Sequence, residues 1–214
     1  MNENLISYYN DRAKEYEKIY SKPERQDDLQ TASFYLQHAF ADKHVLEIAC
    51  GTGYWTEQIA KSASSIYATD INESVIDIAK GKEIPNQYVS FGIEDIYNFN
   101  TLNKHESLFG GFIMSHIKIQ DLDKFLMTIN NVVCPGGKIV FMDNNYVEGS
   151  NLPITNTDEH GNTFQTRKLE DGSSHLVLKN FYSENFLRHK LNGIANEVKF
   201  IKLKYYWILE YNNL

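Results

Sequence analysis

A short apolar run that leads into a glycine turn, residues 45–53, constrains the fold of this chain more than any other stretch. Residues 45–48 predict a buried strand, and residues 49–53 supply small side chains where the backbone can turn sharply and approach a ligand. The apolar pattern resumes at Trp55 and Ile59, which predicts a helix. A strand, a glycine turn and a helix form the first half of a nucleotide-binding βαβ unit.

Acidic side chains on either side of this turn bear on the choice of cofactor. A second predicted strand, residues 65–69, ends on Asp70, whose carboxylate can accept both hydrogen bonds of a ribose diol. A dinucleotide-binding turn needs glycine where this chain has Thr56, and it presents a helix N-terminus to pyrophosphate. Glu47 would repel phosphate and suits a cationic ligand, such as the amino group and sulfonium of S-adenosylmethionine. These residues favour S-adenosylmethionine, with a nicotinamide dinucleotide as the alternative.

At these residues the chain resembles the class I S-adenosylmethionine-dependent methyltransferases. The first motif of that family runs acid-x-Gly-x-Gly-x-Gly, and residues 47–53 read Glu-Ile-Ala-Cys-Gly-Thr-Gly, with Ala49 in place of the first glycine. A predicted helix, the Pro-Gly-Gly of residues 135–137 and the apolar strand that follows resemble the family's connection between its fourth and fifth strands. The resemblance implies an α/β fold: a three-layer, Rossmann-like sandwich around a seven-stranded, mostly parallel sheet whose last strand is antiparallel.

The resemblance also implies a cofactor site along the ends of these strands. Asp70 would hold the ribose, and Glu47 the cationic amino-acid end, directly or through water. An acid after a strand can accept from an exocyclic amine, so Glu94 or Asp95 would bind the adenine while Ile96 packs on its ring; a solvated acidic turn is the alternative. The expected cofactor contacts are Tyr16, Glu47, Ala49, Gly51, Gly53, Asp70, Ile71, Glu94, Asp95, Ile96 and Ser115.

His116 is the candidate catalytic residue. It follows a continuous apolar run, residues 107–114, that predicts a strand buried on both faces. Ligands of open α/β sheets lie outside the carboxyl ends of strands near the topological switch point, so we expect the methyl acceptor beside His116. Its near-neutral pKa suits a general base, whereas a purely structural role is the alternative. A Ser-His pair at this strand end resembles a subset of small-molecule methyltransferases.

Near the N-terminus, a predicted helix over residues 4–20 carries polar aromatic side chains along one face. Tyr9, Arg12, Tyr16 and Tyr20 recur at three- or four-residue spacing. This face either packs the helix on the core or lies over the site, as in the methyltransferases whose N-terminal helix covers the cofactor.

Residues 144–181 begin as a long connection without a regular pattern, which is typical of a functional loop or lid. Two extended runs, residues 164–169 and 174–181, flank an Asp-Gly pair at 171–172 and predict a β-hairpin. We expect this insertion, which follows the fifth strand, to form a flap beside the acceptor pocket. The expected acceptor contacts are Tyr9, Arg12, His116, Asn144, Asn145 and Arg167, with His175 and Lys179 as further candidates.

The size and charge of the chain bound its organisation. We expect one domain over residues 1–214, in which N-terminal helices, residues 1–42, cover the cofactor and residues 144–181 form the insertion. A net charge of −7 makes nucleic acid an unfavourable partner and favours a small-molecule acceptor. Cys50 and Cys134 show no metal spacing and no disulfide framework, so no metal is expected.

The predicted function is transfer of the methyl group of S-adenosylmethionine to an O, N or C nucleophile of a small molecule, leaving S-adenosylhomocysteine. The sequence shows no signal-peptide pattern and no apolar run of membrane-spanning length, so we expect a cytoplasmic protein without a membrane partner. It does not determine the oligomeric state. The alternatives are an RNA or protein methyltransferase, which a surface cluster of Arg167, Lys168 and Lys179 would favour, a non-catalytic S-adenosylmethionine-binding partner subunit, and a nicotinamide-dependent oxidoreductase.

Overall fold

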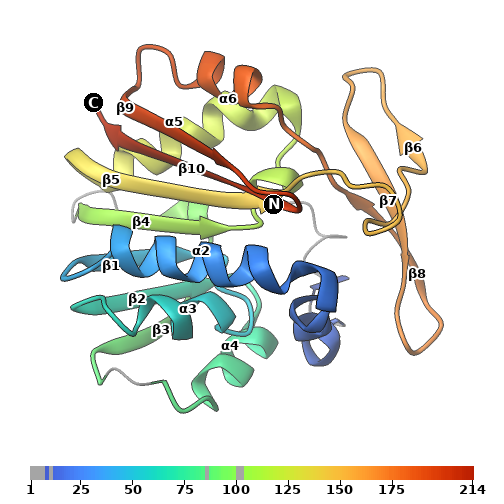
Figure 1. Ribbon diagram of the computed structural model, residues 1–214, viewed down its shortest axis with the longest axis horizontal. Coiled ribbons are helices and arrows are strands. Elements are labelled where there is room, and N and C mark those ends of the chain that lie inside the picture. Colours follow the sequence, from blue (N-terminus) through green and yellow to red (C-terminus); the bar gives the residue numbers. More distant parts are fainter. Residues whose placement is uncertain (1–7, 10–11, 85–86, 100–103) are drawn as a thin grey trace.

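The protein is built around a seven-stranded sheet. Its structure, a computed structural model, describes residues 8–9, 12–84, 87–99 and 104–214. The strand order is β3-β2-β1-β4-β5-β10-β9, and β10 alone runs opposite to the other six strands (Figure 1). The strands are β1 His44–Ile48, β2 Ser65–Asp70, β3 Val89–Ile93, β4 His105–Gly111, β5 Val133–Asn144, β9 Ala195–Lys202 and β10 Tyr206–Asn213. This is the predicted Rossmann-like sheet.

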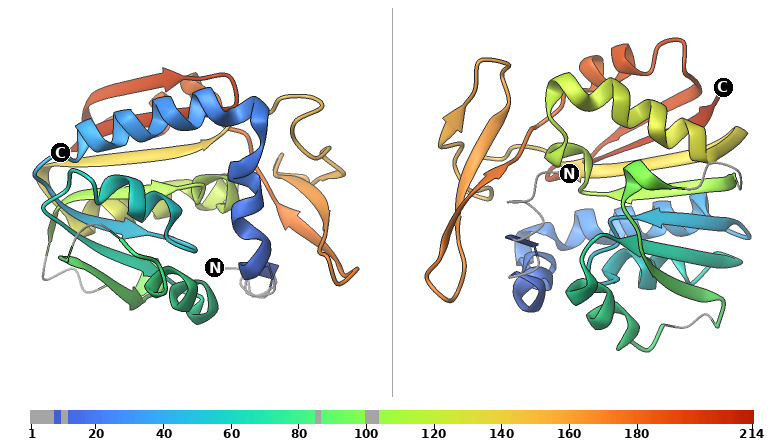
Figure 2. Two further views of the ribbon diagram at one scale, coloured as in Figure 1. Left: turned by 60° about the horizontal axis from the view of Figure 1, so that its bottom comes forward. Right: turned by 180° about the vertical axis from the view of Figure 1, so that it is seen from behind.

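Helices cover both faces of the sheet, as the two views of Figure 2 show. They are α2 Gln26–Ala39, α3 Tyr54–Ile59, α4 Glu73–Lys80, α5 Leu122–Val132 and α6 Glu184–Lys190. Val140 and Met142 of β5 share a core cluster with α2, α3 and α4, whereas Ile139 and Phe141 share the other with α5 and α6. Because successive strand residues point to opposite faces, one apolar run supplies both cores. None of the helices in the described part of the chain is long and apolar enough to span a lipid bilayer.

Two predicted boundaries near the site are corrected by the structure. The strand expected to run to residue 114 ends at Gly111, because Phe112 takes a positive φ of 59° and residues 114–116 form a short 3₁₀ helix, η4 (Met114–His116). The Pro-Gly-Gly of residues 135–137 is not a turn before β5 but lies within it. An irregularity in the β4–β5 register, between the pairs of His105 and Ser107, absorbs these residues.

A second, smaller sheet stands beside the first (Figure 1). It consists of β6 Asn156–Thr157, β7 Thr163–Lys168 and β8 Ser174–Leu178, in that order. The antiparallel pairing of β7 with β8 confirms the predicted hairpin, while the two-residue strand β6 was not predicted. We call residues 144–181, which follow β5 and carry this sheet, the flap.

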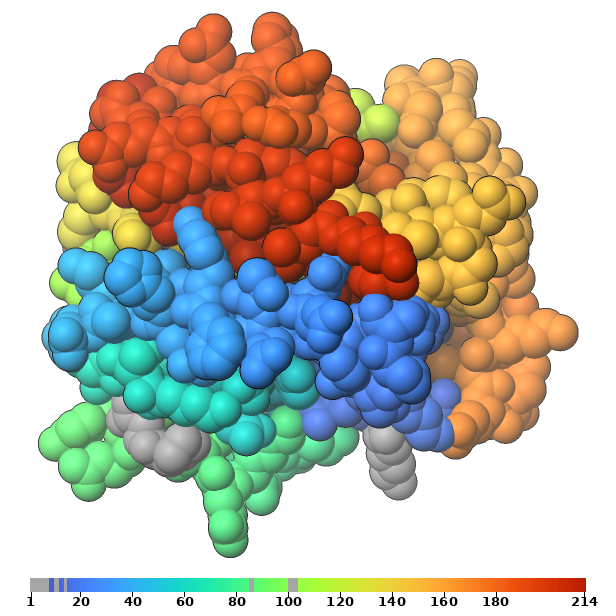
Figure 3. All heavy atoms as spheres, in the orientation of Figure 1, coloured from blue at the N-terminus to red at the C-terminus, as the bar shows by residue number. Residues whose placement is uncertain are grey.

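In the described part of the N-terminal region, where a helix over residues 4–20 is predicted, Tyr8 and Tyr9 are α-helical and Ala13–Ser21 form a 3₁₀ helix, η1. Residues 4–7 and 10–11 of that prediction lie outside the described residues. A second short turn, η2 (Pro23–Arg25), leads into α2. Figure 3 shows this segment, in dark blue, next to the flap, in yellow and orange. An ion pair between Lys18 and Glu170 joins the N-terminal segment to the flap.

Candidate active site

Two pockets meet at the carboxyl ends of the parallel strands. The sheet pocket lies where β1, β2, β3 and β4 end, and its lining includes Ile48, Asp70, Glu94 and Gly111. The flap pocket lies between the N-terminal segment, the end of β5 and the flap, and has a volume of about 330 Å³. Four residues line both pockets and form their shared wall: Tyr9, Tyr16, Phe112 and His116.

Asp70 and the glycine turn form one side of the sheet pocket. Oδ2 of Asp70 accepts from the Gly51 N–H at 3.0 Å, and Oδ1 accepts from the Asn72 N–H at 2.9 Å. Burial raises the pKa of Asp70, and these backbone hydrogen bonds oppose that shift. A side chain at Gly51 would meet the Tyr16 ring at 3.6 Å, so Tyr16 lies directly over the turn. The carboxylate is thus held at the pocket with free lone pairs for a further donor.

Ala49 shows why the resembled motif has glycine at its position. Its φ is 51°, close to the 54° of Gly51, in the left-handed region that costs a residue with a Cβ about 1–2 kcal/mol. Ala49 keeps the conformation of the motif despite the substitution and lines the sheet pocket. Ile71, Glu94 and Ile96 line it too.

Several expected cofactor contacts lie outside this lining. Glu47 is buried within β1, and its Oε2 has no hydrogen-bond partner among the described residues. Burial, helped by the charge of Asp70, raises the pKa of Glu47 to about 8. Asp95 accepts from the Tyr97 N–H at 3.1 Å and so caps a short 3₁₀ turn, η3 (Ile96–Asn98). Gly53 and Ser115 also lie outside the lining.

His116 stands at the shared wall with both ring nitrogens engaged. Nδ1 lies 2.6 Å from the carbonyl oxygen of Leu178, which can only accept, so Nδ1 carries the proton. Nε2 then accepts from the Tyr9 hydroxyl at 2.6 Å. Burial, together with the charges of Lys179 and Arg167, holds the pKa of His116 well below its usual value. The imidazole is therefore neutral at pH 7, with its basic nitrogen covered by Tyr9.

Behind His116 a buried ion pair joins the flap to the main sheet. Nζ of Lys179 lies 3.0 Å from Oδ1 of Asp143 and donates to Oγ of Ser115 at 2.6 Å. The Ser115 N–H donates to Oδ2 of Asp143 at 2.8 Å. Burial lowers the pKa of Lys179 to about 8, while the Lys179 charge lowers the pKa of Asp143. The sequence analysis missed Asp143, although a carboxylate ending an apolar strand was a usable signal.

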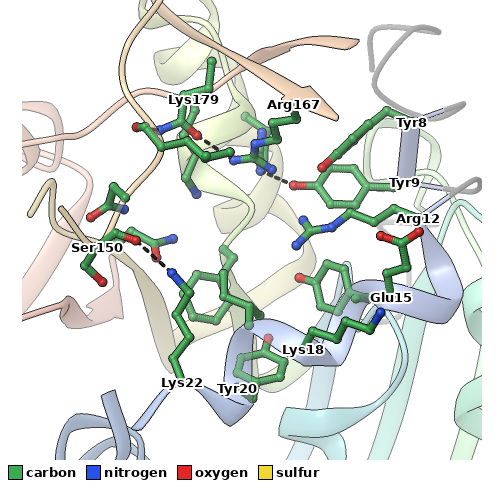
Figure 4. A pocket seen from close by; sticks show the side chains of 18 of the residues that line it. Tyr8, Tyr9, Arg12, Glu15, Lys18, Tyr20, Lys22, Ser150, Arg167 and Lys179 are labelled. Carbon is green, nitrogen blue, oxygen red and sulfur yellow. Dashed lines mark hydrogen bonds between the residues drawn. The ribbon is translucent and has the colours of Figure 1, made fainter. Parts of the chain in front are cut away.

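The flap pocket is lined by many cations, as Figure 4 shows for Arg12, Lys22 and Arg167. Of the predicted acceptor contacts, Tyr9, Arg12, His116, Asn144 and Arg167 line it, as does the further candidate Lys179. Asn145 does not, because its side-chain amide donates to the carbonyl oxygens of Leu203 and Tyr206 at 2.8 and 2.7 Å. His175 also lies outside the lining, with its ring 2.9 Å from the Ser173 hydroxyl. Tyr8, Lys22 and Arg25 line the pocket but were not predicted.

Comparison with known proteins agrees with this architecture. Residues 45–137 match the family model of a methyltransferase domain. The chain is 29% identical over 100 residues to a malonyl-[acyl-carrier protein] O-methyltransferase of Ilyobacter polytropus, covering 46% of this chain and 37% of that protein. It is 28% identical over 102 residues to a ubiquinone biosynthesis O-methyltransferase of Coxiella burnetii, covering 46% and 42%. The chain thus spans about two fifths of the length of these curated relatives.

A solved structure extends the likeness to almost the whole chain. The DhpI–SAH complex superposes with a TM-score of 0.81, at 23% identity, covering 99% of this chain and 96% of that one. At 23% identity this likeness shows the fold. The domain matched by the family model, residues 45–137, contains the glycine turn and the first four strand ends that form the sheet pocket. Residues 45–137 are thus similar to a methyltransferase domain, and the chain as a whole has the Rossmann-like fold of this solved structure.

Proposed function

We propose that the chain transfers the methyl group of S-adenosylmethionine to a small-molecule acceptor, with the cofactor in the sheet pocket and the acceptor in the flap pocket. The observation that carries the proposal is the wall of Tyr9, Tyr16, Phe112 and His116 that the two pockets share. When bound, the cofactor supplies a methyl group already activated by a sulfonium. The protein's main task is to hold donor and acceptor in line at about 3–3.5 Å.

The residues of the sheet pocket fit this cofactor. Asp70 takes the ribose hydroxyls, and Glu94 takes the adenine amino group while Ile96 packs against the ring. Glu47 acts from beneath the turn. Its buried Oε2 has no hydrogen-bond partner among the described residues and favours a cation nearby. The approach of the cofactor's amino group would favour the ionised form of Glu47. The complexed ligand named for the structural neighbour, SAH, is the product of such a cofactor and supports the assignment.

The sheet pocket is narrow and covered by side chains of the N-terminal region. Its volume is about 70 Å³, well below the roughly 300–1,000 Å³ of ordinary ligand pockets. Tyr9 and Tyr16 belong to its lining. We therefore expect this cover to shift when the cofactor enters and to return over it, which would also exclude water from the reacting atoms.

His116 remains the candidate general base. The basic lone pair of His116 is on Nε2, which accepts a hydrogen bond from the Tyr9 hydroxyl. His116 can therefore take a proton from the methyl acceptor through that hydroxyl, or directly after Tyr9 turns away. The Leu178 carbonyl fixes the tautomer that this role requires.

The macromolecular alternatives find less support in the arrangement of charges. The three residues whose surface cluster would favour an RNA or protein acceptor, Arg167, Lys168 and Lys179, instead line the flap pocket, where Lys179 is 5% exposed. A non-catalytic subunit would be expected to fill its acceptor pocket with side chains, whereas the flap pocket is open to a small molecule.

Calorimetric titration with S-adenosylmethionine, S-adenosylhomocysteine and NAD in parallel tests the proposal. We expect the adenosyl ligands to bind in the micromolar range, about −8 kcal/mol, and NAD not to bind. Binding of NAD alone would move the chain to the oxidoreductases. Absence of binding by all three would leave the fold standing and reject the enzyme function.

A further inference from the structure

Positive charge is concentrated in the flap pocket of a chain that is acidic as a whole. The net charge of the protein is −7, yet the pocket's lining has one carboxylate, that of Glu15. Seven cationic residues line the same pocket: Arg12, Lys18, Lys22, Arg25, Arg167, Lys168 and Lys179. Clefts lined by one sign of charge raise the local concentration of ligands of the opposite sign.

Carboxylates outside the lining neutralise only part of this charge. Lys179 is paired with Asp143, and Lys18 with Glu170 at the exposed rim. Glu15 is itself engaged, since its Oε1 accepts from the Glu170 N–H at 3.1 Å. Five cations of the lining therefore have no carboxylate partner among the described residues.

Of these five cations, Arg12 and Arg167 are the two that lie on a common aromatic ring. Their guanidinium groups lie on the same ring, that of the buried Tyr8, at 5.9 and 5.7 Å from its centroid. The Arg12 guanidinium also lies 5.4 Å from the centroid of Tyr16, and it has no hydrogen-bond or ion-pair partner among the described side chains. Arg167 donates from Nη2 to Gln165 at 2.9 Å, while its buried Nε has no partner within the described chain.

A second group of cations lies on the opposite side of the pocket. Arg25 is 2% exposed, and it bonds to Ser150 and Asn144 rather than to a carboxylate. Lys22 donates to the Ser150 carbonyl oxygen at 2.9 Å, and burial together with the Arg25 charge lowers the pKa of Lys22. Arginine is seldom fully buried unless it is paired, so Arg25 adds to the pocket a positive charge that no carboxylate among the described residues offsets.

We propose that the methyl acceptor carries an anionic oxygen group, a carboxylate, phosphate or phosphonate, which Arg12 and Arg167 hold next to the shared wall. That the anionic ligand is the methyl acceptor rests on the proposed function. That the pocket binds an anion rests on the pocket alone. Two planar guanidinium groups offer paired N–H donors that match the geometry of such oxygens. Arg12 lies on Tyr16, a residue of the shared wall, so an anion bound there lies close to the sheet pocket.

Titration calorimetry with acetate, inorganic phosphate and methylphosphonate, in the presence of saturating S-adenosylhomocysteine, tests the proposal, with acetamide as the uncharged control. At least one anion should bind and acetamide should not, and the ranking of the three anions tells a carboxylate site from a tetrahedral one. Arg12→Gln and Arg167→Gln should each weaken anion binding at least tenfold while leaving S-adenosylhomocysteine affinity within about twofold, which also shows that the variants fold.

Arg188→Gln is the matched control, because Arg188 is a half-exposed arginine on α6 that pairs with Glu184 outside the pocket. Its anion affinity should equal that of the unmodified protein. Failure of every anion to bind, or equal losses in Arg188→Gln and the pocket variants, would overturn the inference. If S-adenosylhomocysteine does not bind, the same titrations are run without it: the proposed function then fails, and the anion site is judged on its own result.

Discussion

The sheet pocket and the flap pocket share a wall but are built in different ways. Apart from Tyr9 and Tyr16, the sheet pocket is lined by residues 48–116, mostly at strand ends, and its key carboxylate, Asp70, is fixed by two backbone N–H groups. The flap pocket uses long side chains from segments far apart, such as Arg25 and Asn144, which are 119 residues apart in sequence. One site is held by main-chain geometry, and the other by how the N-terminal segment and the flap pack.

The largest effect is expected where the flap joins the sheet. Lys179→Met would leave Asp143 as an unpaired buried charge, which typically costs about 3–5 kcal/mol of unfolding free energy. Urea unfolding measures the loss. Lys168→Met, at an exposed cation of β7 in the flap, is the control and should stay within about 0.5 kcal/mol. A loss below about 1 kcal/mol in Lys179→Met would show that the pair does not hold the flap.

A large effect on turnover is expected at the shared wall. If His116 is the base, His116→Ala lowers kcat by about 100-fold or more and leaves S-adenosylhomocysteine affinity nearly unchanged. Because the pKa of His116 is held well below its usual value, the neutral base is already formed at pH 6.5, and kcat should stay flat above that pH. Undiminished turnover would assign His116 a structural role, and a rise in kcat between pH 6.5 and 7.5 would contradict the lowered pKa.

A change confined to the sheet pocket should separate the two sites. Asp70→Asn removes the charge and one of the two oxygens that accept from the Gly51 and Asn72 N–H groups, so S-adenosylhomocysteine binding should weaken by about 1.5–3 kcal/mol. Anion binding in the flap pocket should not change. Calorimetry of both ligands on one variant is the measurement, and a parallel loss of both would mean that the pockets do not act as separate sites.

A pH slope of stability is expected from Glu47. Its pKa of about 8 in the folded protein exceeds the value of about 4.3 in an unfolded chain, so the folded state holds a proton that the unfolded state releases. Stability is therefore greatest at low pH for this group and falls by up to about 1.4 kcal/mol per pH unit as pH rises toward 8. Glu47→Gln should flatten the slope between pH 5 and 8 relative to the unmodified protein; an unchanged slope would mean that Glu47 titrates normally.

Local patterns predicted the parts of the molecule that local geometry determines. The turn around Gly51, the strand ending at Asp70 and the hairpin around Asp171-Gly172 each follow from a few adjacent residues with restricted backbone preferences. Ala49 in place of the motif's first glycine did not change the predicted turn, because an alanine can take the left-handed conformation at a tolerable cost in free energy.

The flap pocket could be predicted only in part, because its members meet through tertiary packing. Arg12 and Arg167 were named from separate segments, but nothing in the sequence indicated that both would lie on Tyr8. Lys22 and Arg25, for which the sequence analysis made no prediction, line the pocket as well. The 3₁₀ form of residues 13–21 was missed for a similar reason, since the aromatic spacing of three to four fits both helix types.

A crystal structure of the complex with S-adenosylhomocysteine tests the central claim most directly. The account predicts ribose hydroxyls on Asp70, adenine beside Glu94 and Ile96, and the sulfur facing the wall of Tyr9, Tyr16, Phe112 and His116, with the flap pocket beyond it. A ligand whose sulfur points away from that wall, or one bound in the flap pocket itself, would contradict it.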